Sequence, residues 1–464
     1  MNIKSEEDKI KDIKSRFQQM QDERNKFLPR WKEAEQYVSP STLDWSNLDS
    51  LPDNPVRFSS APCNYLNTLT SGLVGYSVSP NIVWYKLGLE DHKLTNRYRV
   101  KDWLEDVEDV MNAEFSRSAL YKQGAKFVQN AGVYGHGVMF IGEDLANNKL
   151  HFATMKTNEI FLDTDTKGNI DTVFRHYTMT LRNCVDFFGL DSLHEDYKED
   201  YKHVEKWNNK IELLFAVFPR EGFNYEMKDS KNKPYAAIYV DLKNSKIINE
   251  SGFDELPYAI FEWENIPGFA YSESPSNGAM AEIKTLNIAE KTRLRIAQTS
   301  AEPPLIVSAG IRNLNLVPKA RNYIESPTDR IEPIRTGENY PITLDVVQSI
   351  KDNVKDFFHV DFFLMLQQKQ GKMTATEVME LQGEKAAVLS NLIVNLNDAL
   401  QKIIQRSFNL LMRAGKLPPV PQSLRGLGAS MKIDFIGPLS QAQKKYHAMG
   451  GIAQSMQLSS AIMQ

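Results

Sequence analysis

Apolar residues recur every three or four positions over the first forty residues, which is the spacing of an amphipathic α-helix. The positions concerned are Ile10, Ile13, Phe17, Met20, Phe27, Trp31, Ala34 and Val38. Arg24 interrupts the pattern, and Pro29 should kink the helix or split it in two, because proline cannot donate to the preceding turn. One further helix is predicted in the stretch that begins at Ser59, running to about Val74. Another is predicted over about 95–117, and a third follows it to about Tyr134. The first part of the chain is therefore predicted to be mainly helical.

Short runs of β-type residues begin after Gly137 and are separated by turns rich in Asp, Asn and Gly. The runs are 138–141, 151–155, 159–163, 172–177, 211–219, 235–242, 246–250 and 258–263. The segment Asp165–Asn169 is a hairpin signal, and a short helix is expected near Leu181–Phe188. Residues 137–265 are therefore predicted to form an α+β unit inserted among helices.

The pattern becomes helical again at Ser274 and Pro275, where Ser can cap a helix and Pro suits its first turn. The predicted helix runs to Ser300, and its many charged residues leave little continuous apolar face. Such a helix is more stable between neighbouring subunits or beside water than inside an apolar core. A small irregular unit with a β-type run at Leu305–Val307 follows, and a second helix is predicted over Thr343–Leu366.

A short polar run separates that helix from the next one. Its residues are Gln367, Gln368, Lys369, Gln370, Gly371 and Lys372. Thr374 and Glu377 then stand in the relation of a capping box, in which each side chain satisfies one free backbone N–H at the start of a helix. The polar run has nothing to bury, so it is predicted to project into solvent or into a channel.

The helix that starts at this cap is predicted to continue to about Arg413, where Gly415 and Pro418 form a stop signal. A strand at 432–436 and a last helix from about Ser440 follow. That helix shows no cap by Gln464, which is compatible with a natural chain that extends further.

Composition places the chain among ordinary globular proteins. Its 464 residues suggest two or three packed units, and 42% are hydrophobic while 25% are charged. No apolar run approaches the roughly 20 residues that span a bilayer, and the N-terminus lacks a signal-peptide core. Cys63 and Cys184 are too few for a disulfide framework or a tetrahedral metal site, so reduced thiols are expected. No membrane partner is predicted.

The formal net charge is −4, which argues against a protein that grips nucleic acid through many phosphate contacts. It is compatible with a protein past which nucleic acid slides. Basic residues never form a run of four, so no DNA-recognition helix is visible. Lys369 and Lys372 leave two interpretations open: a solvated loop, or a flexible finger that touches a polyanion transiently.

Catalytic motifs are missing from the sequence. The glycines of Gly132–Gly137 precede a strand and lack a following Lys-Ser/Thr, so a simple turn is a better interpretation than a phosphate loop. No serine lies in a nucleophile elbow, and His136, His151 and His176 are interpreted as structural. The chain is predicted not to be an enzyme and to need no cofactor.

Three aspartates form one candidate metal site. Asp163, Asp165 and Asp171 could gather around a divalent ion. A hairpin turn rich in Asp is the commoner explanation of such a cluster.

The order of these elements resembles that of bacteriophage portal proteins, and more narrowly the head-to-tail connector family of short-tailed phages. The stretches that carry the resemblance are Ser71–Val74 with Ser79, Pro80 and Trp84–Leu87, then Ile283–Asn287, Pro303–Leu305, Met373–Val378, Arg413–Pro418 and Gly437–Gln443. Their order covers nearly the whole chain.

The resemblance implies an α+β portal fold, mainly α-helical, with an inserted β-rich wing, long stem helices and a small α/β clip. The implied parts are the wing at 1–273 (helices 1–136, β-rich part 137–265), stem helices at 274–300 and 342–366, the clip at 301–341, a tunnel loop at 367–373, a long helix at 374–418 and a crown-side region at 419–464.

The resemblance also implies a homo-oligomeric ring, typically of twelve copies, at one capsid vertex of the virion, assembled in the host cytoplasm. The terminase large subunit would drive double-stranded DNA through it non-specifically, and the tail would later release the DNA. Tail adaptors, major capsid protein and scaffolding protein are the other implied partners. Clip residues implied to contact terminase or adaptor are Arg312, Lys319, Arg321, Arg330 and Arg335.

Two alternatives belong to other classes. One is a metal-dependent enzyme of phage DNA metabolism that uses the three aspartates, and the other is a monomeric capsid or tail adaptor. Microscopy of the purified protein separates them from a portal, because only the portal forms rings with a central hole.

Overall fold

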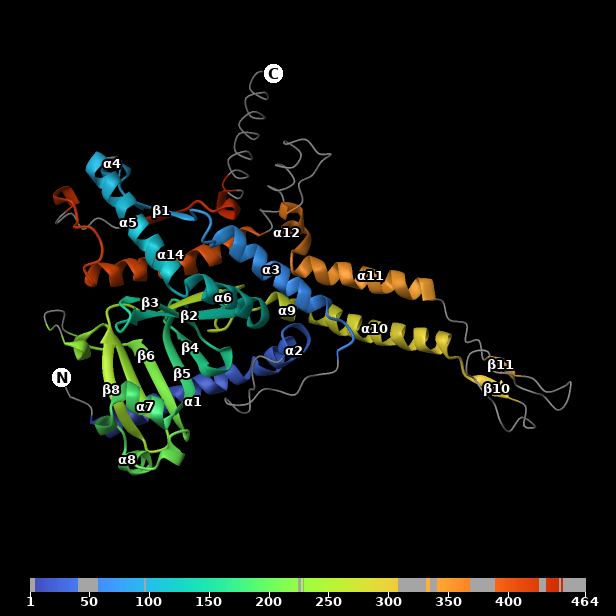
Figure 1. Ribbon diagram of the computed structural model, residues 1–464, viewed down its shortest axis with the longest axis horizontal. Helices are drawn as coiled ribbons and strands as arrows, with labels where there is room; N and C mark the ends of the chain where they lie inside the picture. The colour runs from blue at the N-terminus through green and yellow to red at the C-terminus, as the bar shows by residue number, and fades with distance from the viewer. Residues whose placement is uncertain are drawn as a thin grey trace, which may run out of the picture.

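The computed structural model describes residues 5–40, 57–95, 97–223, 227, 229–307, 331–333, 340–367, 389–424, 431–441 and 444. Within these ranges, a body of helices packed around antiparallel sheets carries a long helical hairpin that projects to one side (Figure 1). The mixture of helix and sheet agrees with the predicted α+β class. No helix in the described parts is long and apolar enough to cross a membrane.

The N-terminal pattern gives two helices, α1 (Glu6–Asn25) and α2 (Leu28–Val38). Pro29 lies in the first turn of α2, so the predicted split at this proline is confirmed. Helix α1 packs on one face of a sheet and forms a separate small core there. Its buried residues are Ile10, Ile13, Phe17 and Met20.

The predicted β-rich segment contains two sheets, of five and three strands. The five-stranded antiparallel sheet has the order β4 (Ile160–Thr164), β5 (Ile170–Thr180), β6 (Lys210–Pro219), β7 (Tyr235–Asp241) and β8 (Lys246–Phe253). The three-stranded sheet has the order β3 (Lys149–Thr154), β2 (His136–Asp144) and β9 (Tyr258–Glu262). Helices α7 (Leu181–Phe188) and α8 (Glu195–Tyr201) lie between β5 and β6 in the chain. The predicted strands are therefore present in this segment, and α7 has the predicted bounds.

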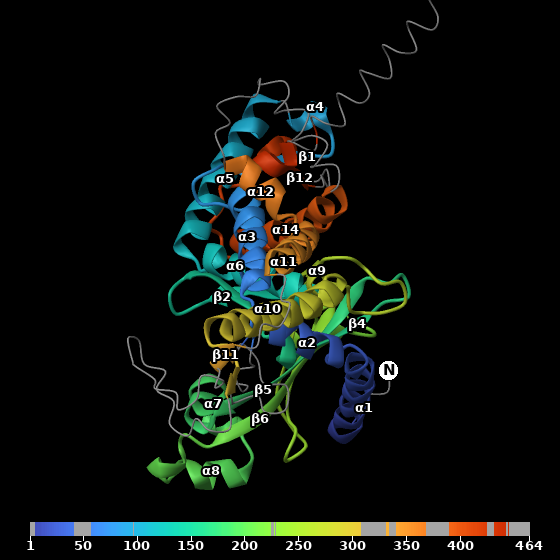
Figure 2. The same cartoon turned by 90° about the vertical axis from the view of Figure 1, so that its right-hand side faces the viewer.

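The main core joins the three-stranded sheet to a layer of helices (Figure 2). These are α3 (Ala61–Ser77), α5 (Tyr98–Arg117), α6 (Leu120–Tyr134) and α14 (Ser390–Arg413). Arg406 fastens α14 to the sheet, because its buried Nε donates to the Ile141 carbonyl oxygen at 2.8 Å. Gly135 ends α6 with φ +90, so the glycine-rich run is the predicted turn.

A third pairing brings distant parts of the chain together. Strand β1 (Tyr85–Leu89) pairs antiparallel with β12 (Met431–Phe435), and Leu87 lies opposite Ile433. The outer edge of β1 is closed by side chains, since Glu108 accepts from the Leu87 N–H at 2.6 Å and Thr95 accepts from the Leu89 N–H at 3.0 Å. Burial raises the pKa of Glu108 despite this hydrogen bond.

Four predicted helices differ from those observed. The helix predicted over 274–300 is divided by a turn at Ala279 into α9 (Pro275–Gly278) and α10 (Met280–Ala301). The helix predicted over 95–117 begins at Tyr98, as α5, and follows the short helix α4 (His92–Thr95). The helix predicted over Thr343–Leu366 is divided into α11 (Tyr340–Phe357) and α12 (Val360–Gln367). The helix predicted from Thr374 to Arg413 is not continuous, because Leu389 lies in a turn and α14 begins only at Ser390.

Candidate functional site

Hydrogen bonds hold the projecting hairpin to the body where it begins. Ser274 caps α9 (Pro275–Gly278) by accepting from the Asn277 N–H at 3.1 Å, as predicted from the Ser-Pro pair. Its hydroxyl also donates to the Val133 carbonyl at 3.0 Å, and the Ser276 hydroxyl donates to the Gly132 carbonyl at 2.7 Å. These bonds tie the start of the hairpin to the end of α6.

A buried carboxylate holds the two long helices of the hairpin together. Glu290 on α10 (Met280–Ala301) is bound at 2.6 Å by Lys351 on α11 and at 2.6 Å by Arg293 on its own helix. Burial opposes ionisation, but the hydrogen bonds from Lys351 and Arg293 outweigh it and lower the pKa of Glu290. Glu290 is therefore charged at neutral pH, and it fixes how α11 lies against α10.

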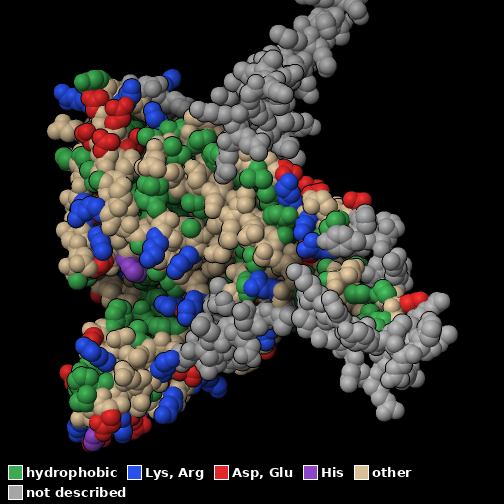
Figure 3. All heavy atoms as spheres, turned by 45° about the vertical axis from the view of Figure 1, so that its right-hand side comes forward, with side chains coloured by type: hydrophobic (Ala, Val, Ile, Leu, Met, Phe, Trp, Pro, Cys, Tyr) green, Lys and Arg blue, Asp and Glu red, His purple; other side chains and the backbone are tan. Residues whose placement is uncertain are grey.

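Helix α11 packs one side and exposes an acidic side. Val347, Val354 and Phe358 are buried on the packed side. Asp345, Asp352 and Asp356 are exposed and follow the i, i+7, i+11 spacing of the opposite face. Acidic side chains are visible along the edge of the hairpin that α11 forms (Figure 3). We call these three residues the acidic stripe.

The break between α11 and α12 falls at one residue with an unusual backbone conformation. His359 adopts φ +50, a conformation that a non-glycine residue rarely takes and that ends a helix. Burial lowers the pKa of His359, so the ring stays neutral at physiological pH. An ion pair between Lys355 and Asp361 spans the break.

Helix α12 is seated in a notch on α3. Phe363 is fully buried against Gly72, and a Cβ atom at residue 72 would overlap its ring. No side chain other than hydrogen would leave this space open. The notch therefore determines how α12 packs against α3.

Most of the sites predicted from the sequence lie outside the described residues. Gln367 is the last residue of α12, and the rest of the polar run falls beyond it. The residues that lie outside are Gln368, Lys369, Gln370, Gly371, Lys372, Thr374, Glu377, Arg312, Lys319, Arg321, Arg330 and Arg335. At the other end of the hairpin, β10 (Leu305–Val307) pairs antiparallel with β11 (Ile331–Pro333). Strand β10 is the predicted β-type run.

The three aspartates considered for a metal serve the β4–β5 hairpin. Asp165 accepts from the backbone N–H groups of Lys167 and Asn169, both at 2.8 Å, which is the role of a turn residue. Asp163 pairs with Arg16 at 3.6 Å, and the Thr172 hydroxyl donates to Asp171 at 2.9 Å. Among the described residues, no group of three or more His, Cys, Asp or Glu side chains could hold a metal ion.

The acidic stripe and the Gly72 notch were missed by the sequence interpretation. The spacing of the aspartates was a readable signal for the stripe, but which side of α11 is exposed follows from its packing, which includes the contact between Glu290 and Lys351. The notch had no signal in the sequence, because Gly72 lies inside an ordinary helical pattern.

Comparison with known proteins identifies the family. The profile of the family described as bacteriophage head to tail connecting protein matches residues 10–464. The chain therefore belongs to the bacteriophage head to tail connecting protein family, which is structural rather than enzymatic.

Two curated relatives agree with this assignment. The portal protein of Salmonella phage epsilon15 is 28% identical over 443 residues, covering 92% of this chain and 78% of the relative. The probable portal protein of Bordetella phage BPP-1 is 24% identical over 458 residues, covering 95% of this chain and 81% of the relative. The role of the chain is thus that of a phage portal, the connector between head and tail in the virion.

Proposed function

We propose that copies of this chain assemble into a ring, typically of twelve, in which the α10–α11 hairpins form a stem around a central channel for double-stranded DNA. The observation that carries the proposal is the projecting hairpin itself. Its two helices run away from the body and are held together by the buried Glu290 and Lys351 pair. A ring of such hairpins encloses a tube, whereas a single hairpin encloses nothing.

The acidic stripe then lines the channel. It lies on the side of α11 that faces away from α10, and α11 leads through α12 to Gln367, where the proposed tunnel loop 367–373 begins. Aspartates repeated around a ring repel DNA phosphates, so they keep DNA from binding to the wall while it is packaged or ejected. A basic wall would slow the DNA, since phosphate contacts with Lys and Arg persist.

The remaining parts follow from the same arrangement. Residues 1–273 form the wing, and 419–464 lie on the crown side. The clip at 301–341, with its five cations, contacts the terminase large subunit during packaging and tail adaptors afterwards. Major capsid and scaffolding proteins contact the ring where it sits at the capsid vertex, during assembly in the host cytoplasm.

Negative-stain microscopy of the purified full chain tests the ring. We expect particles with a central hole, and mass photometry should give an integral multiple of the 53.0 kDa chain mass. A compact monomer at micromolar concentration, or metal-dependent nuclease activity, would overturn the proposal in favour of an adaptor or an enzyme.

A further inference from the structure

Helix α6 carries positive charge on the side that faces solvent. Lys122 and Lys126 are exposed there, and no ion pair joins either of them to another residue in the described parts of the chain. They are one turn apart, about 6 Å along the helix, so they lie on the same side of it. Between Glu114 and Glu143 the sequence contains no acidic residue. No carboxylate on α6 itself therefore offsets the two ammonium groups.

The segment that follows β3 runs beside α6. Thr154 donates its N–H to the Gln123 side chain at 3.1 Å and its hydroxyl to the Gln123 carbonyl at 2.8 Å. Further along the helix, the Asn130 side chain donates to the Met155 carbonyl at 3.2 Å. The next residue, Lys156, is therefore held beside α6.

Lys156 adds positive charge to this surface. Its side chain is 56% exposed and pairs with Glu159 at 3.3 Å, but the same carboxylate also binds Arg175 at 2.8 Å. One carboxylate thus serves two cations, and positive charge remains in excess. We call Lys122, Lys126 and Lys156 the α6 ridge.

The α6 ridge lies on the body and not on the projecting hairpin. The hairpin is tied to the C-terminal end of α6, where the Gly132 carbonyl accepts from the Ser276 hydroxyl. Lys126 and Lys122 come about 9 and 15 Å before Gly132 along the helix, and α6 lies within the body (Figure 1). The α6 ridge and the acidic stripe of α11 are therefore separate surfaces.

The chemistry of the α6 ridge suits a nucleic-acid backbone better than a protein partner. In α6, which is described throughout, no large apolar side chain is exposed. The centre of a protein interface is usually apolar, whereas phosphate contacts require only cations and polar donors. Phosphates follow one another about every 3.4 Å along the axis of one DNA strand, so two lysines about 6 Å apart can reach the same strand.

We infer that the α6 ridge binds the phosphates of double-stranded DNA on the body of the ring, outside its channel. The inference rests on the ring proposed above, because that role brings DNA to the body. Binding is independent of base sequence, since lysine contacts with phosphates carry no base information. The weak net negative charge of the chain does not prevent it, because exposed charges act over only about 10 Å at 0.1 M salt.

Closed circular DNA tests the α6 ridge separately from the channel, because a circle cannot thread through a ring that is already assembled. Rings of the full-length chain are mixed with a closed circular plasmid, and retention is measured by gel shift between about 50 and 200 mM salt. Natural rings should retain the plasmid at low salt. Rings with both Lys122→Gln and Lys126→Gln should bind at least about threefold more weakly at 50 mM salt, with a shallower salt dependence.

Lys198→Gln combined with Lys202→Gln is the matched control. These lysines of α8 have the same four-residue spacing, but they pair with Glu195 and Glu199 at 2.8 and 2.6 Å. The control loses the same charge as the α6 ridge variant and should bind the plasmid like natural rings. Mass photometry checks that every variant assembles to the natural size, and far-UV circular dichroism checks that it folds.

Several results would overturn the inference and leave the ring in place. These are natural rings that do not retain the closed circle, equal affinity in the α6 ridge variant and the natural ring, or an equal loss in the control. Failure of the folded α6 ridge variant to form rings would also overturn it, because the ridge would then contact a neighbouring copy rather than DNA. A natural chain that never forms rings would instead reject the proposed function.

Discussion

His136 is a histidine that the fold keeps uncharged. It lies at the start of β2 with 1% of its surface exposed, and the rings of Trp31 and Tyr271 lie 5.2 and 5.3 Å from its own. Burial, followed by the nearby charge of Arg24, lowers the pKa of His136 to about 3. The unfolded chain has an ordinary histidine there, which takes up a proton at a much higher pH.

This difference predicts how stability depends on pH. Between about pH 6.5 and pH 3 the unfolded state binds a proton that the folded state does not, so His136 makes stability fall with decreasing pH, by up to about 1.4 kcal/mol per unit. Above that window it contributes no pH dependence. Urea denaturation of His136→Phe between pH 5 and pH 7.5 should show a shallower slope than the natural chain, whereas the exposed His151→Gln should not. Equal slopes for all three would mean that another group controls acid stability.

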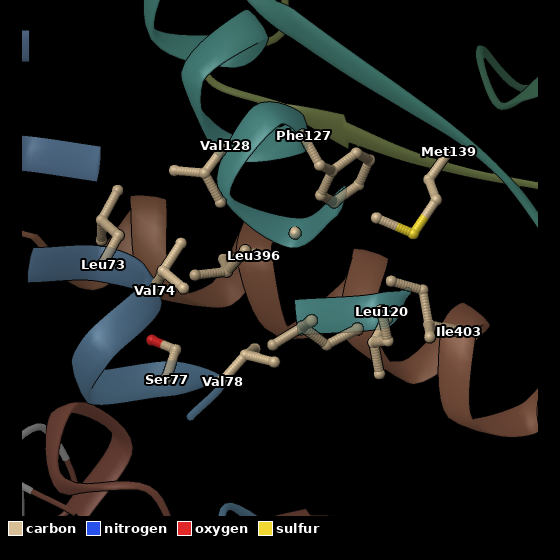
Figure 4. Close-up of a pocket in the computed structure, with 12 residues that line it drawn as sticks. Leu73, Val74, Ser77, Val78, Leu120, Phe127, Val128, Met139, Leu396 and Ile403 are labelled. Atoms are coloured by element: carbon tan, nitrogen blue, oxygen red, sulfur yellow. The ribbon is translucent and has the colours of Figure 1, made fainter. Parts of the chain in front are cut away.

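Gly124 borders a small apolar cavity of about 20 Å³ between α3, α6 and α14. Side chains such as Leu73, Phe127 and Leu396 surround the space (Figure 4). A Cβ atom at Gly124 meets nothing within 4 Å. Gly124→Ala should therefore stabilise the fold by about 1 kcal/mol through helix propensity. Thermal and urea denaturation measure the change, and a loss of stability would show that the cavity cannot accept a methyl group.

At the scale of elements, the position of α12 depends on one missing side chain. Gly72→Ala should force Phe363 out of the notch and destabilise the fold by about 1–3 kcal/mol, the usual cost of overpacking. Gly75→Ala, on the same helix but exposed, should be neutral or slightly stabilising. Hydrogen exchange in α12 should rise only in Gly72→Ala. Equal stability and equal hydrogen exchange in the two variants would show that the notch does not hold α12 in place.

The sequence predicts the elements whose cause is local and misses those whose cause is distant. The β-rich segment, helix α7 and the Ser274 cap follow from alternation and capping, so they were found. The break at His359 was missed, because Phe358 and Phe362 keep helical spacing through it and Phe363 finds its partner on a helix almost three hundred residues earlier in the chain. The proposed tunnel loop and clip cations remain predictions, since they lie outside the described residues.

At the scale of the whole molecule, the acidic stripe predicts how charge affects DNA passage. Replacing Asp352 and Asp356 by Lys should slow packaging at least about threefold in low salt, and added salt should restore much of the rate because exposed charges are screened within about 10 Å at 0.1 M. Replacing the exposed Asp106 and Asp109 of α5 by Lys changes the net charge equally but should leave the rate unchanged. The packaging rate is measured with fluorescent DNA, purified motor and assembled heads. If the variant with Lys at positions 352 and 356 packaged DNA at the same rate as the natural chain, the stripe would not face the DNA.

The pairing of β1 with β12 has a consequence for how the chain is made. Strand β1 leaves the ribosome long before its partner strand β12 does. Closing so long a loop delays this part of the fold until β12 has been synthesised. A chain that stops before β12 leaves β1 without its partner strand, and the two-stranded sheet cannot form. The two-stranded sheet thus distinguishes chains that include β12 from chains that stop earlier, and only the former have this part of the fold when they assemble.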